Sequence, residues 1–155
     1  MGFDKDFGMA YAKSQIAASN SLPSKGLAFI SLKNGHKDEG VDLAKQLIKL
    51  NFTLCGTAGT ADYIRKNGIK CKTINKVSGG SPHIVDILNS KKIALVINTG
   101  GGNSEYRLDD AMALRRATLG NKVPYCTNMS TAQACLKGIR SLKTKKLSVI
   151  SLQDI

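Results

Sequence analysis

The sequence lacks tryptophan, is poor in aromatic residues and has no long apolar run. Aromatic residues make up 5% of its 155 positions, so platforms on which nucleic-acid bases stack are scarce. No apolar stretch approaches the roughly 18 residues of a membrane-spanning helix. Residues 1–13 include Asp4 and Asp6 and no apolar core, unlike a signal peptide. We therefore expect a protein without a membrane partner.

Cysteine pairs at metal-binding or redox spacing are also missing. The cysteines lie far apart and form no CxxC pair, and no histidine accompanies them at the spacing of a metal site. Three of them fall in apolar strand-like or helical patterns, where a free cysteine behaves as a small hydrophobic residue. This predicts no metal site and favours the reducing cytoplasm. The residues concerned are Cys55, Cys71, Cys126 and Cys135.

Acidic residues are few, and the formal net charge is +12 from 23 Lys and Arg against 11 Asp and Glu. Such a charge attracts anionic partners. The basic residues are spread along the chain and no nucleic-acid-binding motif is present, so we expect no nucleic-acid partner. A small anionic ligand or an acidic neighbouring protein explains the charge equally well. A basic module for nucleic acid or an acidic protein remains the alternative.

Short apolar runs alternate with helical patterns through most of the chain. The runs are apolar throughout, as expected of strands that are buried on both faces. This alternation predicts an α/β fold, a three-layer sandwich with a mainly parallel central sheet. The expected strands are 27–31, 52–55, 69–74, 93–97, 123–126 and an edge strand at 147–152, and the clearest expected helices are 37–50 and 108–119.

The N-terminal segment is expected to form a unit of its own. Residues 7–19 have the pattern of an amphipathic helix, and the polar, Pro- and Gly-containing stretch 19–26 ends it. We therefore divide the chain into a linker helix at 1–22 and a domain at 23–155.

The stretch 53–60 carries the first functional signal. A β-prone run ends at a loop of small residues, and a helical pattern follows. Such a turn presents free backbone N–H groups and the positive end of the helix dipole, and Gly56 and Gly59 allow close approach. With the hydroxyls of Thr57 and Thr60, this predicts a phosphate site. The spacing matches neither the P-loop nor the dinucleotide fingerprint, so an ordinary strand-to-helix turn with threonine caps remains the alternative.

Ligands of parallel sheets bind outside the carboxyl ends of the strands, where the polar loops of this chain fall. Lys37 is placed at a helix start, where a cation opposes the helix dipole and a bound anion would relieve that cost. Ser81-Pro82 is predicted to cap the next helix, and Asp109-Asp110 to start another. The candidate ligands in these loops are Lys37, Thr57, Thr60, Lys76 and Asn98.

The order and spacing of these loops resemble the methylglyoxal-synthase-like domain, in particular the C-terminal regulatory domain of the carbamoyl phosphate synthetase large subunit. Residues 7–20 further resemble the helix that leaves the preceding domain of that subunit. The resemblance implies that the chain is a piece of a larger protein. The segments that carry it are Lys33-Asn34-Gly35-His36-Lys37, Thr57-Ala58-Gly59-Thr60, Asn75-Lys76-Val77, Pro82-His83-Ile84-Val85-Asp86, Ile97-Asn98-Thr99 and Arg115-Arg116.

The resemblance implies allosteric regulation of carbamoyl phosphate synthesis, for pyrimidine and arginine biosynthesis, by a nucleotide monophosphate such as UMP or IMP. It implies that Lys37, Thr57, Thr60 and Lys76 hold the phosphate and Asn98 contacts the nucleoside. Ser31, Val77 and Thr99 are further pocket positions, and Thr127 matches a contact to ornithine.

The implied parent is a glutamine-hydrolysing, ATP-dependent ligase that uses Mg²⁺ or Mn²⁺. Its active sites would lie outside this chain, which itself would be non-catalytic and hold no cofactor. The implied partners are the rest of the large subunit and the glutamine-amidotransferase small subunit.

Two features bear on the alternative, a methylglyoxal-synthase-like lyase acting on a triose phosphate. That chemistry needs a carboxylate, which in the synthase directly follows a Gly-Gly pair. Here Ser81 follows Gly79-Gly80, and Asp86 is expected as a solvated or capping residue, so we favour binding without turnover.

The chain departs from the family pattern after Asn98-Thr99. Gly100 stands where the family often has Thr, Ser or Pro, and a longer loop, 101–106, follows. This change bears on which ligand binds.

Overall fold

The computed structural model describes residues 1–100, 105–151 and 153, with the backbone alone at 105–107. A five-stranded sheet in the order β3-β2-β1-β4-β5 forms its centre, and every pairing is parallel. This confirms the predicted parallel α/β sheet. The strands are β1 (Gly26–Ser31), β2 (Phe52–Gly56), β3 (Lys72–Thr73), β4 (Ile93–Asn98) and β5 (Tyr125–Cys126).

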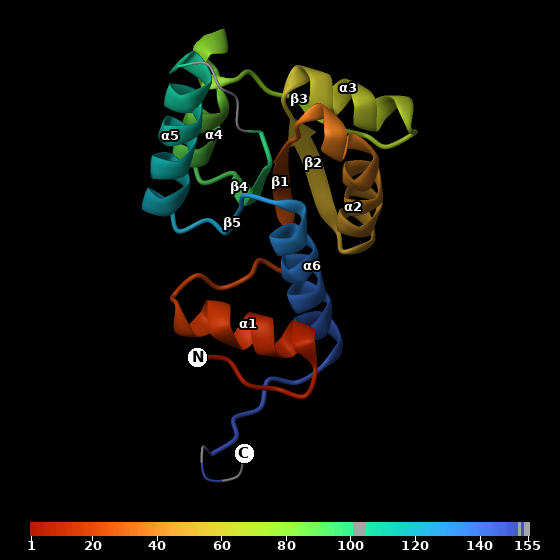
Figure 1. Ribbon diagram of the computed structural model, residues 1–155, viewed down its shortest axis with the longest axis vertical. Helices are drawn as coiled ribbons and strands as arrows, with labels where there is room; N and C mark the ends of the chain where they lie inside the picture. The colour runs from red at the N-terminus through yellow and green to blue at the C-terminus, as the bar shows by residue number, and fades with distance from the viewer. Residues whose placement is uncertain (101–104, 152, 154–155) are drawn as a thin grey trace.

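Helices cover both faces of the sheet and complete the three layers (Figure 1). Helices α4 and α5 pack on one face, and α2, α3 and α6 pack on the other. Two single turns of 3-10 helix, η1 (Asn34–His36) and η2 (Val77–Gly79), lie in loops that follow strands. The helices are α1 (Phe7–Ala17), α2 (Lys37–Lys49), α3 (Ala58–Lys66), α4 (Ile84–Asn89), α5 (Glu105–Gly120) and α6 (Met129–Thr144).

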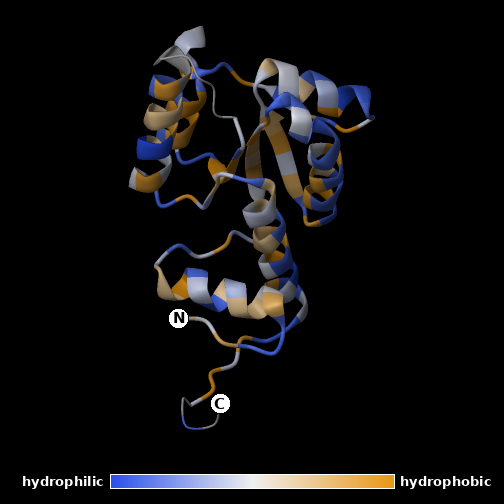
Figure 2. Cartoon of the chain, in the orientation of Figure 1, coloured by the Kyte–Doolittle hydropathy of each residue, from blue (hydrophilic) through white to orange (hydrophobic). Residues whose placement is uncertain are grey.

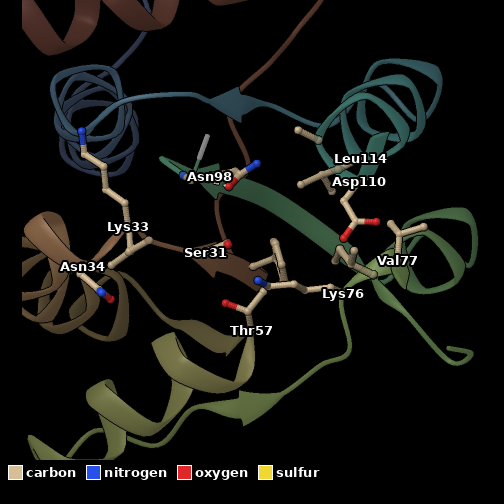
Figure 3. A pocket seen from close by; sticks show the side chains of 14 residues that line it. Ser31, Lys33, Asn34, Thr57, Lys76, Val77, Asn98, Asp110 and Leu114 are labelled. Carbon is tan, nitrogen blue, oxygen red and sulfur yellow. Dashed lines mark hydrogen bonds between the residues drawn. The ribbon is translucent and has the colours of Figure 1, made fainter. Parts of the chain in front are cut away.

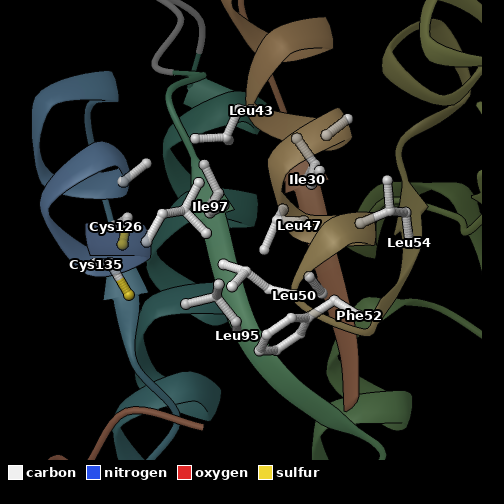
Figure 4. Close-up of a cluster of buried hydrophobic side chains, with 14 of the residues drawn as sticks. Ile30, Leu43, Leu47, Leu50, Phe52, Leu54, Leu95, Ile97, Cys126 and Cys135 are labelled. Atoms are coloured by element: carbon white, nitrogen blue, oxygen red, sulfur yellow. The ribbon is translucent and has the colours of Figure 1, made fainter. Parts of the chain in front are cut away.

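The apolar strands divide their side chains between two cores. Along β1, Ala28 and Ile30 join the cluster under α2 and α6, whereas Phe29 joins the cluster under α4 and α5. Figure 2 shows the central strands as hydrophobic ribbons, and Figure 4 shows Ile30 and Ile97 meeting Leu47 of α2. Burial on both faces is why these strands are continuous apolar runs.

The predicted edge strand at 147–152 is wrong. Residues 147–151 have no regular secondary structure, and residue 152 lies outside the described residues. Helix α6 carries the chain away from the sheet, so the apolar run has no strand to pair with (Figure 1). Leu147 and Val149 are exposed instead. The expected strand at 69–74 is also shorter, because only Lys72 and Thr73 pair with β2.

The predicted cap at Ser81-Pro82 is wrong as well. The Ser81-Pro82 peptide bond is cis, and α4 begins at Ile84 with His83 as its N-cap. The His83 side chain accepts a hydrogen bond from the Asp86 N–H, and the Asp86 carboxylate accepts one from the His83 N–H at 2.9 Å. Asp86 is therefore a capping residue, one of the two roles expected for it.

Helix α1 lies outside the three layers but packs closely on α6 (Figure 1). The backbones approach where Gly8 faces Lys137, and a Cβ atom on Gly8 would lie 2.5 Å from the Lys137 carbonyl oxygen. Gly138 of α6 leaves room for Leu22 and Tyr11 in the same way. The boundary expected at residue 22 therefore separates two segments of chain that are in tight contact.

Asp6 joins the two helices through its carboxylate. It forms an ion pair with Lys145 at 2.8 Å, accepts a hydrogen bond from the Ser141 hydroxyl at 2.6 Å, and caps α1 through the Met9 N–H at 2.8 Å. The bond to Lys145, followed by those from Ser141 and Met9, holds the pKa of Asp6 well below its usual range. The carboxylate thus stays ionised and able to accept all three bonds.

All four cysteines are free and buried. Burial raises the pKa of the Cys55 thiol to about 12 and that of Cys71 to about 11. Both thiols are therefore protonated at neutral pH and act as packing residues. None of the described helices is long and apolar enough to cross a membrane.

The close contact between α1 and α6 can be tested by Gly8→Ala. The added methyl group would meet the Lys137 backbone and the Ser141 hydroxyl, and such overpacking costs about 1–3 kcal/mol of unfolding free energy. Gly120→Ala is the matched control, because a Cβ atom there meets nothing within 4 Å. Chemical denaturation should show Gly8→Ala destabilised and Gly120→Ala unchanged or stabilised. Equal stability of the two variants would contradict the described packing.

Candidate functional site

Two adjoining cavities open at the carboxyl ends of the strands, with volumes of about 430 and 390 Å³. They share four lining residues and form one elongated site. The first cavity, drawn in Figure 3, lies between β1, β4, α5 and the loop after β3. The second extends over the start of α3. The shared residues are Leu32, Asn34, Thr57 and Lys76.

The second cavity has the character of an anion site. Thr57 is the N-cap of α3, and the N–H groups of Ala58 and Gly59 donate no hydrogen bond within the part of the chain that the structure describes. The ammonium of Lys37 lies over this first helical turn, because a Cβ atom on Gly59 would be 3.9 Å from its Nζ. Lys76 lines the same cavity. Two ammonium groups and a helix N-terminus thus face one space, an arrangement that suits a phosphate.

The Lys37 side chain is held beside an aromatic ring. Its Nζ atom lies 5.6 Å from the centre of the Tyr63 ring, and the Tyr63 hydroxyl donates a hydrogen bond to Asp38. A lysine at the first position of α2 opposes the dipole of its own helix. The cation–π contact partly offsets this cost and directs the ammonium toward α3.

Thr60 and Thr99, both expected at the site, hold the loops together. Thr60 is 2% exposed, and its hydroxyl oxygen accepts hydrogen bonds from the Leu32 N–H at 3.0 Å and the Thr57 hydroxyl at 3.3 Å. Thr99 accepts a bond from the Lys33 N–H at 3.4 Å and lines neither cavity. The hydroxyl of Thr60 therefore ties the loop after β1 to the start of α3.

The first cavity combines an apolar wall with a few polar groups. Asn98 is 8% exposed, donates a hydrogen bond to the Tyr125 hydroxyl at 3.2 Å and accepts one from the Gly100 N–H at 3.2 Å. Ser31 and Val77, both expected here, also line it. The apolar wall consists of Phe29, Leu32, Val77, Ile84, Ala111 and Leu114.

Gly100 keeps the end of β4 open. A Cβ atom at this position would lie 3.3 Å from Asn98 Oδ1, which is tight, and 3.8 Å from Ser31 Oγ, which is an ordinary contact. The absence of a side chain at residue 100 thus leaves more room beside Asn98. Most of the longer loop expected at 101–106 lies outside the described residues.

Asp110 is an acidic lining residue that the sequence patterns do not place at the site. Its carboxylate oxygens accept hydrogen bonds from the Ser78 N–H at 3.0 Å and the Ser78 hydroxyl at 2.7 Å. We expected it at a helix start, but α5 begins at Glu105, which places Asp110 in the second turn. Its spacing of four from the buried Leu114 puts both on one face of the helix, and that was the available signal.

Thr127, expected to contact ornithine, is exposed in the loop between β5 and α6 and lines neither cavity. Among the described residues, no group of three or more His, Cys, Asp or Glu side chains is arranged to hold a metal ion. The described lining residues therefore offer ammonium groups, backbone N–H groups, hydroxyls, the amides of Asn34, Asn75 and Asn98, and the carboxylate of Asp110.

Comparison with known proteins gives consistent matches. Residues 39–127 match the model of the MGS-like domain. The chain is 43% identical over its whole length to the carbamoyl phosphate synthase large chain, C-terminal section, of Methanopyrus kandleri, and 42% identical to that of Aquifex aeolicus. It spans 28% and 29% of the length of these relatives.

The chain is also similar to a longer relative and to a solved structure. The chain is 40% identical to the carbamoyl phosphate synthase large chain of Mesorhizobium japonicum, of which it spans 13%. The crystal structure of methylglyoxal synthase from Elizabethkingia anophelis matches with a TM-score of 0.57 and 16% identity, over 74% of this chain and 79% of that one. This second likeness shows the fold alone.

The role of Thr60 in joining the loops can be tested by Thr60→Val, which keeps the shape but removes the hydroxyl. The buried Leu32 N–H loses its acceptor, and an unsatisfied buried donor costs about 1–3 kcal/mol. Thr60→Ser retains the hydroxyl and is the control. In urea denaturation, wild type should have the highest unfolding free energy, Thr60→Ser a lower one and Thr60→Val the lowest. If Val equals wild type, the hydrogen bond contributes nothing to stability.

Proposed function

The chain belongs to the MGS-like domain family, and on this premise we propose that its strand-end site binds a nucleoside monophosphate such as UMP or IMP. The observation that carries the proposal is the convergence of Lys37 and Lys76 on the N-terminus of α3. A phosphate monoester fits this end because it carries up to two negative charges and several acceptor oxygens.

The adjoining cavity suits the nucleoside. Its volume of about 430 Å³ lies within the usual range for small-ligand pockets. Its apolar wall would contact the faces of a base, while Ser31 and Asn98 offer hydrogen bonds to the sugar or base. Thr57 lies at the junction of the two cavities, next to the bond between phosphate and sugar in such a complex.

The proposed role is feedback regulation within a carbamoyl phosphate synthase large chain. The support is the similarity over the whole of this chain to large-chain relatives that are several times longer. In this proposal the rest of the large chain, with the glutamine-hydrolysing subunit, carries out ATP-dependent synthesis for pyrimidines and arginine in the cytoplasm. An effector controls a distant site only if it binds two states of the protein with different affinity.

The surfaces that would pass on such a signal are the N-terminal helix and the loop around Thr127. Residues 1–22 would be the segment that links this domain to the preceding part of the large chain. Thr127, exposed before α6, would contact an ornithine-type activator at the boundary with that part.

The nucleotide site is tested by calorimetric titration with UMP, IMP and inorganic phosphate. Lys37→Ala removes a charged hydrogen-bond donor and should weaken UMP and phosphate binding about 10- to 100-fold. Lys45→Ala is the matched control, since Lys45 is an exposed lysine on the same helix that lines neither cavity. If both substitutions weakened binding equally, the anion would be held by the general positive charge of the protein and not by a specific site. Absence of UMP and IMP binding to wild type would reject the proposal.

A triose-phosphate lyase is a second candidate, because Asp110 brings a carboxylate to the cavity that adjoins the proposed phosphate site. Both of its oxygens accept hydrogen bonds from Ser78 and are therefore occupied. A carboxylate engaged in this way is poorly placed to give and take protons during turnover. Binding without turnover is therefore the better-supported function.

This choice is tested by incubating the chain with dihydroxyacetone phosphate and assaying methylglyoxal. We expect no product above the uncatalysed background, even where the same compound displaces phosphate from the site. Ser78→Ala is the second variant to assay, because it frees one Asp110 oxygen and so tests whether an unoccupied carboxylate supports turnover. Product formation by wild type that Asp110→Asn abolishes would overturn the binding-only assignment.

A further inference from the structure

The loop between β3 and α4 carries Lys76 and Val77 into the site, and its internal hydrogen bonds are few. One of them runs from the Asn75 side-chain NH₂ to the Gly80 carbonyl oxygen at 3.5 Å. The two ends of the loop are joined to each other, because the Ile84 N–H donates to the Asn75 carbonyl oxygen at 3.2 Å. Between them, the Gly79 N–H donates to the Lys76 carbonyl oxygen at 3.0 Å and closes the single turn η2. Residues 78–81 are exposed.

Two glycines make this loop costly to order. Gly79 and Gly80 follow Ser78 directly, and Gly80 has a φ of 83°, in the region that favours glycine. A segment with such residues loses more conformational entropy on ordering than other segments do. If the loop ordered only on binding, that cost would be subtracted from the affinity for the ligand.

The end of the loop is held to α4, because the Ser81 hydroxyl donates to the Asp86 carboxylate at 2.7 Å. The η2 turn that follows Lys76 is held by one residue of α5. Within the described residues, the side-chain hydrogen bonds that join 76–80 to another element both go to Asp110 of α5. The carboxylate accepts from the Ser78 N–H at 3.0 Å and from the Ser78 hydroxyl at 2.7 Å. Both bonds are charge-assisted, and together they fix the position and the orientation of the turn.

We propose that Asp110 is a positioning residue, which holds the η2 turn through Ser78 and thereby presets Lys76 at the anion site. The inference rests on the proposed function, because it assigns Lys76 a ligand to meet. Asp110 acts through Ser78, since its oxygens already have donors. The ammonium of Lys76, two residues before Ser78, is brought near the start of α3 before any anion arrives.

If Asp110 acted only through its charge, its loss would change the affinity for phosphate in the opposite direction. A carboxylate in the cavity next to an anion site repels the anion, so neutralising it should strengthen phosphate binding if charge were all that mattered. If Asp110 positions the loop, neutralising it should weaken binding despite the more favourable charge. The direction of the change therefore separates the two roles.

The experiment compares Asp110→Asn with Asp109→Asn, a neighbouring exposed carboxylate that lines neither cavity. Asp110→Asn replaces one acceptor with an NH₂ donor that faces a Ser78 donor. Calorimetric titration with inorganic phosphate and with UMP should show it about 3- to 10-fold weaker than wild type. Asp109→Asn removes the same charge and should bind as wild type or slightly more tightly.

Ser78 provides variants that leave the charge of the site unchanged. Ser78→Ala removes one of the two bonds and should weaken phosphate binding, while Ser78→Thr keeps a hydroxyl and should weaken it less. Ser78→Ala should weaken phosphate binding less in the Asp110→Asn variant than in wild type, because both substitutions remove the same hydrogen bonds.

Hydrogen exchange supplies a readout that needs no ligand. The amides of residues 76–80 should exchange faster in Asp110→Asn and Ser78→Ala, whereas the midpoint of global unfolding should not change. Unchanged or tighter phosphate binding in Asp110→Asn, or unchanged exchange in the loop, overturns the inference while leaving the proposed function intact. Failure of wild type to bind phosphate or UMP overturns both.

Discussion

All five strands of the sheet point in the same direction, and the site depends on this constraint. In a parallel sheet every strand ends at the same edge, so the loops after the strands gather there. Each following helix also begins at that edge and directs its free N–H groups toward it. The loops that carry Lys37, Thr57, Lys76 and Asn98 come from four separate parts of the chain and meet for this reason.

Charge within the site is arranged along its length. The chain as a whole is strongly basic, but most of its lysines are exposed and contribute only a general attraction for anions. Lys37 and Lys76 differ because they share a cavity with the N-terminus of α3. In the adjoining cavity, Asp110 contributes a negative charge whose oxygens are engaged with Ser78. In the proposed function, recognition of an anion rests on these two local lysines, while the net charge draws the ligand in.

Much of this arrangement could be predicted from the sequence, because strand burial and loop position follow from local patterns. The apolar runs at Leu27 and Ile93 indicated strands covered on both faces, and the small-residue loop at Thr57 indicated a helix start. The edge strand at 147–152 failed because an apolar run contains no information on whether a partner strand is within reach. Asp110 and the tether to Ser78 were missed because they join residues 32 positions apart. No local pattern reports such a contact.

The glycine contact between α1 and α6 bears on how this chain is divided into units. A boundary near residue 22 describes the covalent order of the chain, but a cooperative unit is defined by shared contacts. Because Gly8 and Gly138 let the two helices touch along their backbones, and Asp6 joins α1 to Ser141 and Lys145, α1 should melt together with α6 and the sandwich. The segment between α1 and β1 is then a covalent connection inside one thermodynamic domain, and cutting it would leave α1 bound in place.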